Sequence, residues 1–254
     1  MKSYVVSFLL FTTFLLLASC GKDTNVGQLE ETNHQNLQVS QEKKESFKEL
    51  SEEEAKKIVK ENIENQNKVM MELTEEYPEW WSQNFEEETE EFVKANEIVK
   101  EKLSPYVSNR ALETYSGGYL ISYFCECGGF DLLTSRNIDV RFQIEEQTKD
   151  RLEVSFISLE DLAGYNNVGT YFLHFRKIDG TWKLTNERYI DSKKLPLNLT
   201  SEEIYAAFPN TNVVILDEVE FNNQQYFIIV DNDLTYGVNK KDSSINYEIA
   251  ENYQ

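Results

Sequence analysis

Histidine, cysteine and proline are scarce in this chain of 254 residues, which contains two His, three Cys and four Pro. So few ligand and thiol side chains leave little material for a metal centre or a disulfide framework, and we expect no metal and no cofactor. Basic residues are also in deficit, because 25 Lys and Arg face 45 Asp and Glu and the net charge is −20. Nucleic acid and anionic lipid surfaces are met by clustered cations, so this charge argues against both as partners.

Sequence fingerprints of common enzyme classes are absent as well. The chain has no Gly-x-Ser-x-Gly, no His-Glu-x-x-His, no P-loop and no dinucleotide-binding glycine motif. It does have 40% hydrophobic residues, enough to bury the core of one good-sized domain, with or without a small appendix. We therefore expect a folded protein without a catalytic constellation.

The first 20 residues carry the strongest functional signal. Met1-Lys2 is a short positive end, and the apolar run Tyr4–Leu17 that follows is too short to span a bilayer but is typical of an export signal. Leu17-Ala18-Ser19-Cys20 resembles the lipobox of bacterial lipoproteins. The resemblance implies that residues 1–19 are a signal peptide and that Cys20 carries a diacylglycerol thioether. The alternative is an ordinary secretory signal with an incidental cysteine.

A lipidated Cys20 predicts where the protein works. Two acyl chains hold a protein firmly on a membrane, so we expect it at the cell membrane, on the extracytoplasmic side. Residues 20–46 are polar and show no helical or strand period, which predicts a disordered tether. Some 25 flexible residues have an r.m.s. span of roughly 25–30 Å, so the folded body stands off from the lipid.

Three helices are predicted after the tether. Ser51 and Glu54 form a capping box that begins a helix running to about Glu76. A second helix is predicted from about Phe85 to Leu103. Ser104-Pro105 has the pattern of an N-cap followed by proline at the first helical position, which predicts a third, short helix to about Tyr115.

The pattern then changes to period two, which predicts strands. The expected strands are Tyr119–Cys127, Ile138–Glu145, Leu152–Leu159, Thr170–Ile178 and Thr181–Ile190. Asp179-Gly180 has the composition of a two-residue hairpin turn. After Pro196 we expect a helix capped by Thr200 that runs to Phe208, and three further strands near Val213–Phe221, Gln225–Val230 and Leu234–Val238.

The order of helices first and long strands later, ending in the hairpin His174–Leu184 with its Asp-Gly-Thr-Trp turn, resembles the NTF2-like (cystatin-like) α+β fold. The resemblance covers about residues 51–191. It implies an α+β domain over residues 47–194 in which N-terminal helices pack on a curved antiparallel sheet, with core or a pocket between them. Residues 195–254 lie outside it and are expected to form a small C-terminal appendix of a helix and strands. Members of this fold include enzymes, dimer scaffolds and ligand binders, so the fold leaves the activity open.

Cys125 and Cys127 are the most reactive pair of side chains in the predicted domain. On a strand their Cα atoms would lie roughly 6.5–7 Å apart, beyond the usual disulfide separation, so a bridge needs a turn or strain. Gly128-Gly129 directly after them supplies a possible turn. A strained bridge outside the cytoplasm would be exchangeable. The alternatives are an inert disulfide or two small apolar residues packed on one sheet face.

His174 and Arg176 are the candidate ligand-binding residues. They share one face of their predicted strand with Phe172, while Tyr171, Leu173 and Phe175 occupy the other. If the first face lines the space between helices and sheet, His174 and Arg176 meet an anionic or polar ligand, or His174 acts as a general base. Such a base needs an orienting carboxylate, for which the candidates are Asp139, Glu145, Asp161 and Glu187. The alternative is an exposed or hydrogen-bonded sheet histidine.

Two further motifs have structural interpretations. Trp80-Trp81 after Pro78 is either an exposed aromatic contact for a protein or glycan, or an anchor of a helix junction to the core. Asp231-Asn232-Asp233 begins like a calcium loop, but Thr235 and Tyr236 stand where that pattern needs Asx and Gly. We predict a turn between strands there.

These observations favour a membrane-tethered extracytoplasmic lipoprotein with a non-enzymatic domain that binds a protein partner or a small ligand. A second hypothesis is an enzyme or thiol-redox module that uses His174, Arg176 and the Cys125/Cys127 pair in an NTF2-like pocket. A third is a structural role through dimerisation of the sheet face.

Overall fold

Each helix of the N-terminal half begins at a side-chain cap. The computed structural model describes residues 47–253, apart from 83–84, 87–88, 125–137, 160–167 and 209–211. Helix α1 (Glu52–Glu76) follows Ser51, whose hydroxyl accepts from the Glu54 N–H while the Glu54 carboxylate accepts from the Ser51 N–H. A 3₁₀ turn, η1 (Pro78–Ser82), comes next, followed by α2 (Glu90–Leu103) after Thr89 and α3 (Asn109–Tyr123) after Ser108.

The first helix is confirmed, and the other two differ from the prediction. The second begins only at its Thr89 cap. The third is wrong at both ends, because Ser108 rather than Ser104 is its N-cap and the helix continues to Tyr123 through the first part of a predicted strand. Ser116, Leu120 and Tyr123 are buried at helical spacing, so the apolar residues Leu120 and Tyr123 belong to a packed helix face.

The middle of the chain forms a four-stranded antiparallel sheet. Its strands are β1 (Gln143–Gln147), β2 (Arg151–Ser158), β3 (Gly169–Ile178) and β4 (Thr181–Asp191), in the order β1-β2-β3-β4. Three of them lie where predicted, whereas the strand expected from Ile138 begins only at Gln143. Asp179 and Gly180 have φ values of 51° and 84°, which confirms the two-residue turn between β3 and β4.

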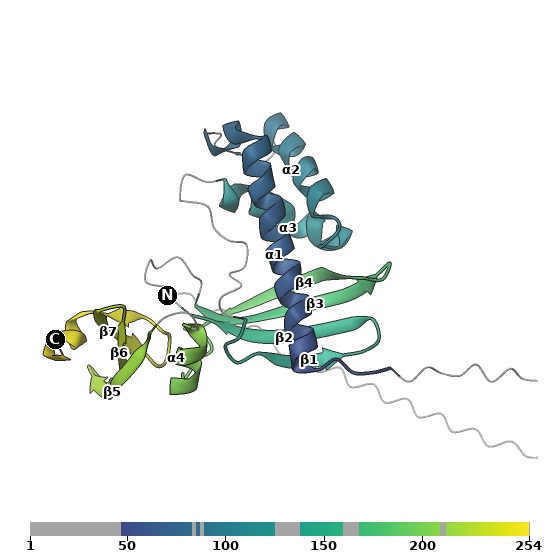
Figure 1. Ribbon diagram of the computed structural model, residues 1–254. Helices are drawn as coiled ribbons and strands as arrows, with labels where there is room; N and C mark the ends of the chain where they lie inside the picture. The colour runs from purple at the N-terminus through teal and green to yellow at the C-terminus, as the bar shows by residue number, and fades with distance from the viewer. Residues whose placement is uncertain are drawn as a thin grey trace, which may run out of the picture. The chain divides into compact units, whose positions relative to one another are not determined.

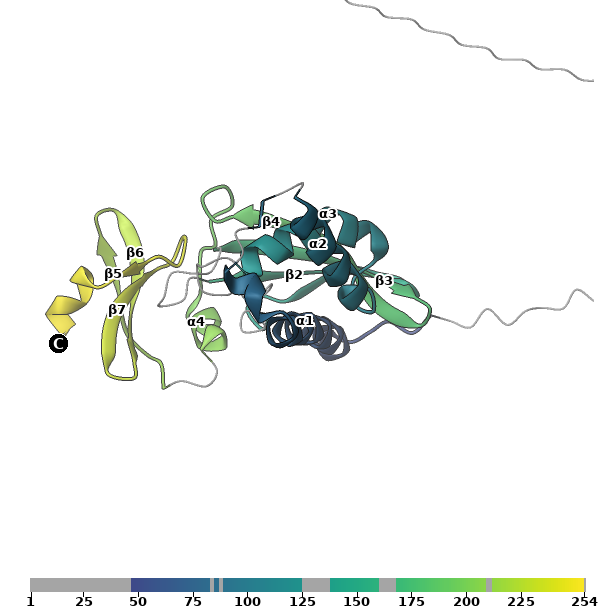
Figure 2. The ribbon, with the colours of Figure 1, turned by 90° about the horizontal axis from the view of Figure 1, so that it is seen from above.

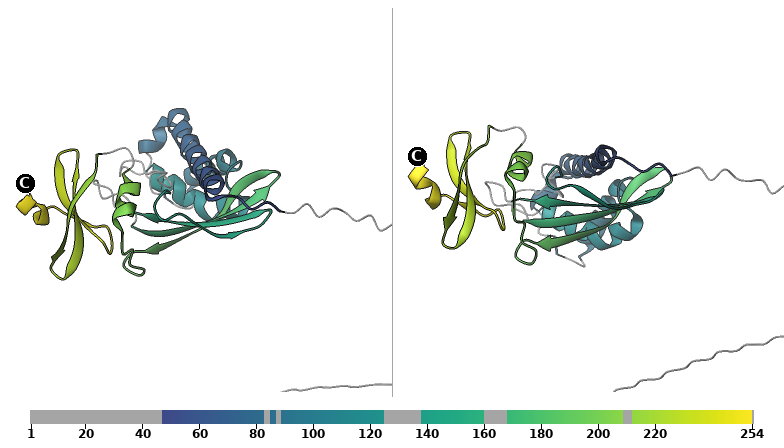
Figure 3. Two further views of the ribbon diagram at one scale, coloured as in Figure 1. Left: turned by 60° about the horizontal axis from the view of Figure 1, so that its bottom comes forward. Right: turned by 90° about the horizontal axis from the view of Figure 1, so that it is seen from below.

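One hydrophobic cluster contains the buried side chains of α1, α2 and α3 together with those of β2, β3 and β4. Figures 1 and 2 show these helices on one side of the strands, and the view from below in Figure 3 shows the strands in front of the helices. Tyr171, Leu173 and Phe175 of β3 point into this cluster and are each at most 9% exposed. Buried Asn62 of α1 donates to the Tyr106 and Trp182 carbonyls, which ties α1 to the β4 edge.

The C-terminal part is a second antiparallel sheet with one short helix. It contains α4 (Ser201–Ala207), β5 (Val214–Phe221), β6 (Gln224–Asp231), β7 (Leu234–Asn239) and β8 (Ile245–Asn246), and a 3₁₀ turn η3 (Glu248–Tyr253) follows (Figure 3). The helix capped by Thr200 and the first three strands confirm the prediction. Asn232 and Asp233 have φ values of 47° and 71°, as residues of a tight turn between β6 and β7 do.

Contacts join this sheet to the first one. Val140 and Ile157 share a hydrophobic cluster with Leu197, Phe227 and other residues of the C-terminal part. Arg141 forms a bidentate pair with Glu203 at the start of α4, with N–O distances of 2.5 and 2.7 Å. The described residues are therefore α+β, with two antiparallel sheets, while the division at residue 194 stays a prediction. Among them no helix is long and apolar enough to cross a membrane.

Candidate functional site

The alternation of β3 places His174 and Arg176 on the sheet face turned away from the helices. Tyr171, Leu173 and Phe175 fill the core, as the period of two requires, so the opposite face carries the predicted site residues. His174 and Arg176 therefore do not line the space between helices and sheet. Hydrophobic side chains occupy that space, and the candidate site is on the outer face.

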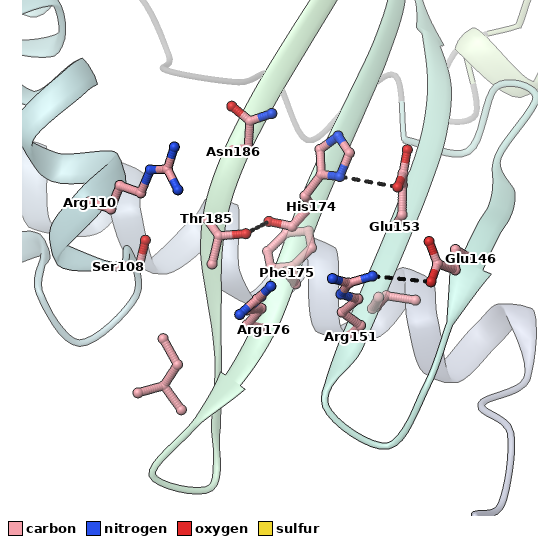
Figure 4. Close-up of a pocket in the computed structure, with 12 residues that line it drawn as sticks. Ser108, Arg110, Glu146, Arg151, Glu153, His174, Phe175, Arg176, Thr185 and Asn186 are labelled. Atoms are coloured by element: carbon pink, nitrogen blue, oxygen red, sulfur yellow. Dashed lines mark hydrogen bonds and ion pairs between the residues drawn. The ribbon is translucent and has the colours of Figure 1, made fainter. Parts of the chain in front are cut away.

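A pocket of about 590 Å³ lies on this outer face (Figure 4). Its floor is formed by strands β1–β4, and its side by the beginning of α3. The polar residues around it include Arg110, Glu146, Arg151, Glu153, His174 and Arg176. Three of the six arginines of the chain thus surround one pocket, in a protein whose net charge is −20.

The beginning of α3 is held against the edge of β4. Ser108 donates its N–H to the Leu184 carbonyl at 2.9 Å, and Leu184 donates to the Tyr106 carbonyl at 2.9 Å. These bonds continue the sheet by one short parallel bridge before the chain turns into the helix. Arg110, the second residue of α3, is thereby brought to the pocket from a position far from β3 in the sequence.

Three cations lie side by side across the sheet, and two of them, Arg151 and Arg176, line the pocket. In the strand register Arg151 of β2 is opposite Arg176 of β3, and Arg176 is opposite Lys183 of β4. Directly opposed residues have Cβ atoms about 4.5–5.5 Å apart, and like charges at such positions destabilise a sheet. The basic row, as we call Arg151, Arg176 and Lys183, therefore costs stability unless negative charge lies on it.

The acidic residues of the pocket neutralise the basic row only in part. Glu146 contacts Arg151 at 3.3 Å, and Lys183 donates to the Ser104 carbonyl. Arg110 and Arg176 form no ion pair with any residue of the described chain. Their guanidinium groups are exposed and able to hold an oxyanion by paired N–H bonds.

His174 has a carboxylate partner, Glu153, which is not among the four candidates predicted from the sequence. Its Nδ1 lies 3.1 Å from Glu153 Oε2, because Glu153 is opposite His174 in the register of β2 and β3 (Figure 4). The four candidates proposed from sequence are not with it. Asp139 pairs with Lys60, Glu145 accepts from Ser155, and Asp161 lies outside the described residues. The fourth, Glu187, is on the opposite face of the sheet.

A bulge in β4 turns Glu187 inward. The register of β3 and β4 shifts at Thr185, whose hydroxyl donates to the His174 carbonyl at 3.0 Å, and Glu187 then lies opposite buried Leu173. Burial raises the pKa of the Glu187 carboxyl to about 7. Burial, with the nearby Glu187 charge second, also raises the pKa of Tyr119 on α3. The Glu187 carboxyl forms no hydrogen bond or ion pair within the described parts of the chain.

This inward carboxyl predicts a pH-dependent stability. A folded pKa above the unfolded value of about 4.3 means that the folded state holds the proton more tightly, so the free energy of unfolding falls as pH rises from about 4.5 to 7. Glu187→Gln removes the titration and should be more stable than the natural chain at pH 8 by about 3–4 kcal/mol, and nearly equal to it near pH 4.5.

Urea unfolding from pH 4.5 to 8 measures this difference. Glu75→Gln on the exposed face of α1 is the matched control and should leave the pH profile unchanged. A Glu187→Gln profile parallel to that of the natural chain would show that Glu187 titrates as an exposed carboxyl does.

The remaining predicted sites are placed as follows. Cys20, Cys125 and Cys127 lie outside the described residues, so their modification and pairing stay predictions. No group of three or more His, Cys, Asp or Glu that could hold a metal ion occurs in the described part of the chain. Trp80 is 5% exposed and stacks on Tyr77 with ring centroids 4.5 Å apart, which supports its interpretation as a core anchor.

Comparison of the chain with models of known protein families, with curated proteins and with solved structures gives no match. The geometry of the site is therefore the evidence on function.

Proposed function

We propose that this protein is a lipoprotein, anchored through Cys20 to the extracytoplasmic side of the cell membrane, that binds a small anionic ligand. In this proposal residues 20–46 are the tether and residues 47–194 are an NTF2-like domain that carries the binding pocket. The anchor rests on the lipobox resemblance at Leu17–Cys20. The NTF2-like assignment rests on the order of elements and on the His174–Leu184 hairpin.

The basic row carries the binding part of the proposal. Evenly distributed charge would place acids over most of this surface, yet three cations are directly opposed on neighbouring strands. Arg110 adds a fourth cation from the start of α3. A carboxylate or phosphate group would relieve the repulsion among them and accept the N–H bonds that Arg110 and Arg176 leave unused.

A second candidate function rests on the His174–Glu153 contact. A histidine whose Nδ1 faces a carboxylate has the geometry of an oriented general base, which is the enzymatic alternative. His174→Ala separates the two. A binding protein should retain most of its affinity because the arginines remain, whereas an enzyme should lose nearly all turnover of its substrate.

Binding of inorganic phosphate tests the proposed function. We expect Arg176→Gln to weaken phosphate binding by about 10- to 100-fold, because a charge-assisted hydrogen bond is worth roughly 1.5–3 kcal/mol. Titration calorimetry on the full chain in detergent measures the affinity. Lys68→Gln on the exposed face of α1 removes the same charge away from the pocket and should change it less than twofold. Equal affinities for the natural chain and Arg176→Gln would exclude the pocket as an anion site.

A further inference from the structure

A further arginine is held on the same sheet face, beyond the pocket. Arg188 of β4 lies opposite Phe172 of β3, and its guanidinium carbon is 3.8 Å from the centre of the Phe172 ring. Arg188 is exposed, and it forms no ion pair with any residue that the structure describes. The Phe172 ring is half-buried, so it is a fixed platform for the stacked group.

Stacking prepares this guanidinium to bind an oxyanion. The contact with the ring uses the flat face of the group and leaves its N–H edge available for paired hydrogen bonds. It also restricts the rotamers of a long side chain before any ligand arrives, which reduces the entropy lost on binding. Arg188 is therefore a preorganised cation, unlike a free surface lysine.

The distance between Arg188 and the basic row is set by the strands, because Arg188 lies opposite Phe172 and the basic row contains Arg176. Phe172 and Arg176 are four residues apart on β3, which corresponds to about 13 Å at the rise of an extended strand. Residues of even number on β3 share the outer face, so His174 lies between them. Asn186, opposite His174, and Glu153 complete a polar strip that offers hydrogen-bond donors and acceptors.

We propose that the pocket is one end of a longer binding site, that Arg188 on Phe172 is its second anchor, and that the ligand carries two anionic groups about 13 Å apart joined by a polar linker. This inference rests on the proposed function, because the first anionic group occupies the basic row. The ligand is short, since the chain as a whole carries a charge of −20 and repels a long polyanion beyond the site.

Two peptides of equal charge and composition test the spacing. In acetyl-Glu-Pro-Pro-Pro-Glu-amide the stiff proline spacer holds the two acidic residues about 12 Å apart, and in acetyl-Glu-Glu-Pro-Pro-Pro-amide they are adjacent. We expect the natural full chain, in detergent, to bind the spaced peptide about tenfold more tightly. Arg188→Gln should abolish this preference, so that the variant binds the two peptides with equal affinity.

Two further variants make the outcomes distinguishable. Phe172→Leu keeps an apolar side chain but removes the stacking, and it should reduce the preference for the spaced peptide, which identifies Phe172 as a positioning residue. Arg176→Gln should weaken both peptides and phosphate. If Arg188→Gln retains the preference for the spaced peptide, or if the natural chain has no such preference, the two-point site is wrong. Loss of phosphate affinity in Arg176→Gln would in those cases still support the proposed function.

Discussion

Replacing Cys20 by serine is expected to move the protein completely from the membrane fraction to the soluble fraction outside the cytoplasm. The proposed anchor is a thioether to diacylglycerol, which a serine hydroxyl does not form. Each buried methylene of an acyl chain contributes about 0.8 kcal/mol, so the loss of two chains removes most of the membrane affinity. Net negative charge on the rest of the chain adds repulsion from anionic lipid.

Cell fractionation and the intact mass of the purified protein measure this effect. Cys125→Ser is the matched control, since it changes another cysteine to serine and should leave both the location and the lipid mass unchanged. Retention of Cys20→Ser in the membrane fraction, with its mass lacking both lipid and residues 1–19, would overturn the anchor and favour another mode of attachment.

Trp80→Ala is expected to be the most destabilising single change in the helical part. Trp80 is 5% exposed and contacts the rings of Tyr77, Phe85 and Phe124, with centroids 4.5, 5.8 and 5.2 Å away. Truncation of a buried tryptophan leaves a large cavity and costs about 3–5 kcal/mol. That is a large fraction of the 5–15 kcal/mol by which a typical domain is stable.

The neighbouring tryptophan is the control. Trp81 is 37% exposed, so Trp81→Ala should lower the free energy of unfolding by only about 1 kcal/mol. Urea unfolding of both variants gives the comparison. Similar losses for the two would contradict the assignment of Trp80 as the anchor of the helix junction and would reopen the exposed-contact interpretation of the pair.

Part of the candidate site could be predicted from the sequence. A period of two is enough to place His174 and Arg176 on one face of a strand and Leu173 on the other. The same period does not say which face meets the helices. The interpretation of His174 and Arg176 as residues that line the space between helices and sheet depended on that choice, and both lie on the outer face instead. Burial distinguishes the faces only after the strand has been packed.

The other site residues depend on long-range pairing. Glu153 meets His174, and Arg151 meets Arg176, through the register of β2 and β3. The segment between those strands is too long to set the register as a two-residue turn does for β3 and β4. Arg110 enters from a helix that docks on the β4 edge. None of these contacts leaves a local sequence signal.

The sequence by itself determined the features that depend on neighbouring residues: the capping boxes at Ser51 and Thr200, the turn at Asp179-Gly180 and the strand periodicity around it. Caps and tight turns are satisfied by hydrogen bonds and backbone angles within a few residues, so their pattern is legible locally. Only the tertiary structure decided that residues 119–123 are helical, that a bulge turns Glu187 inward, and that the cations of three strands form a row. These features depend on packing and strand register between distant segments, which override local propensity.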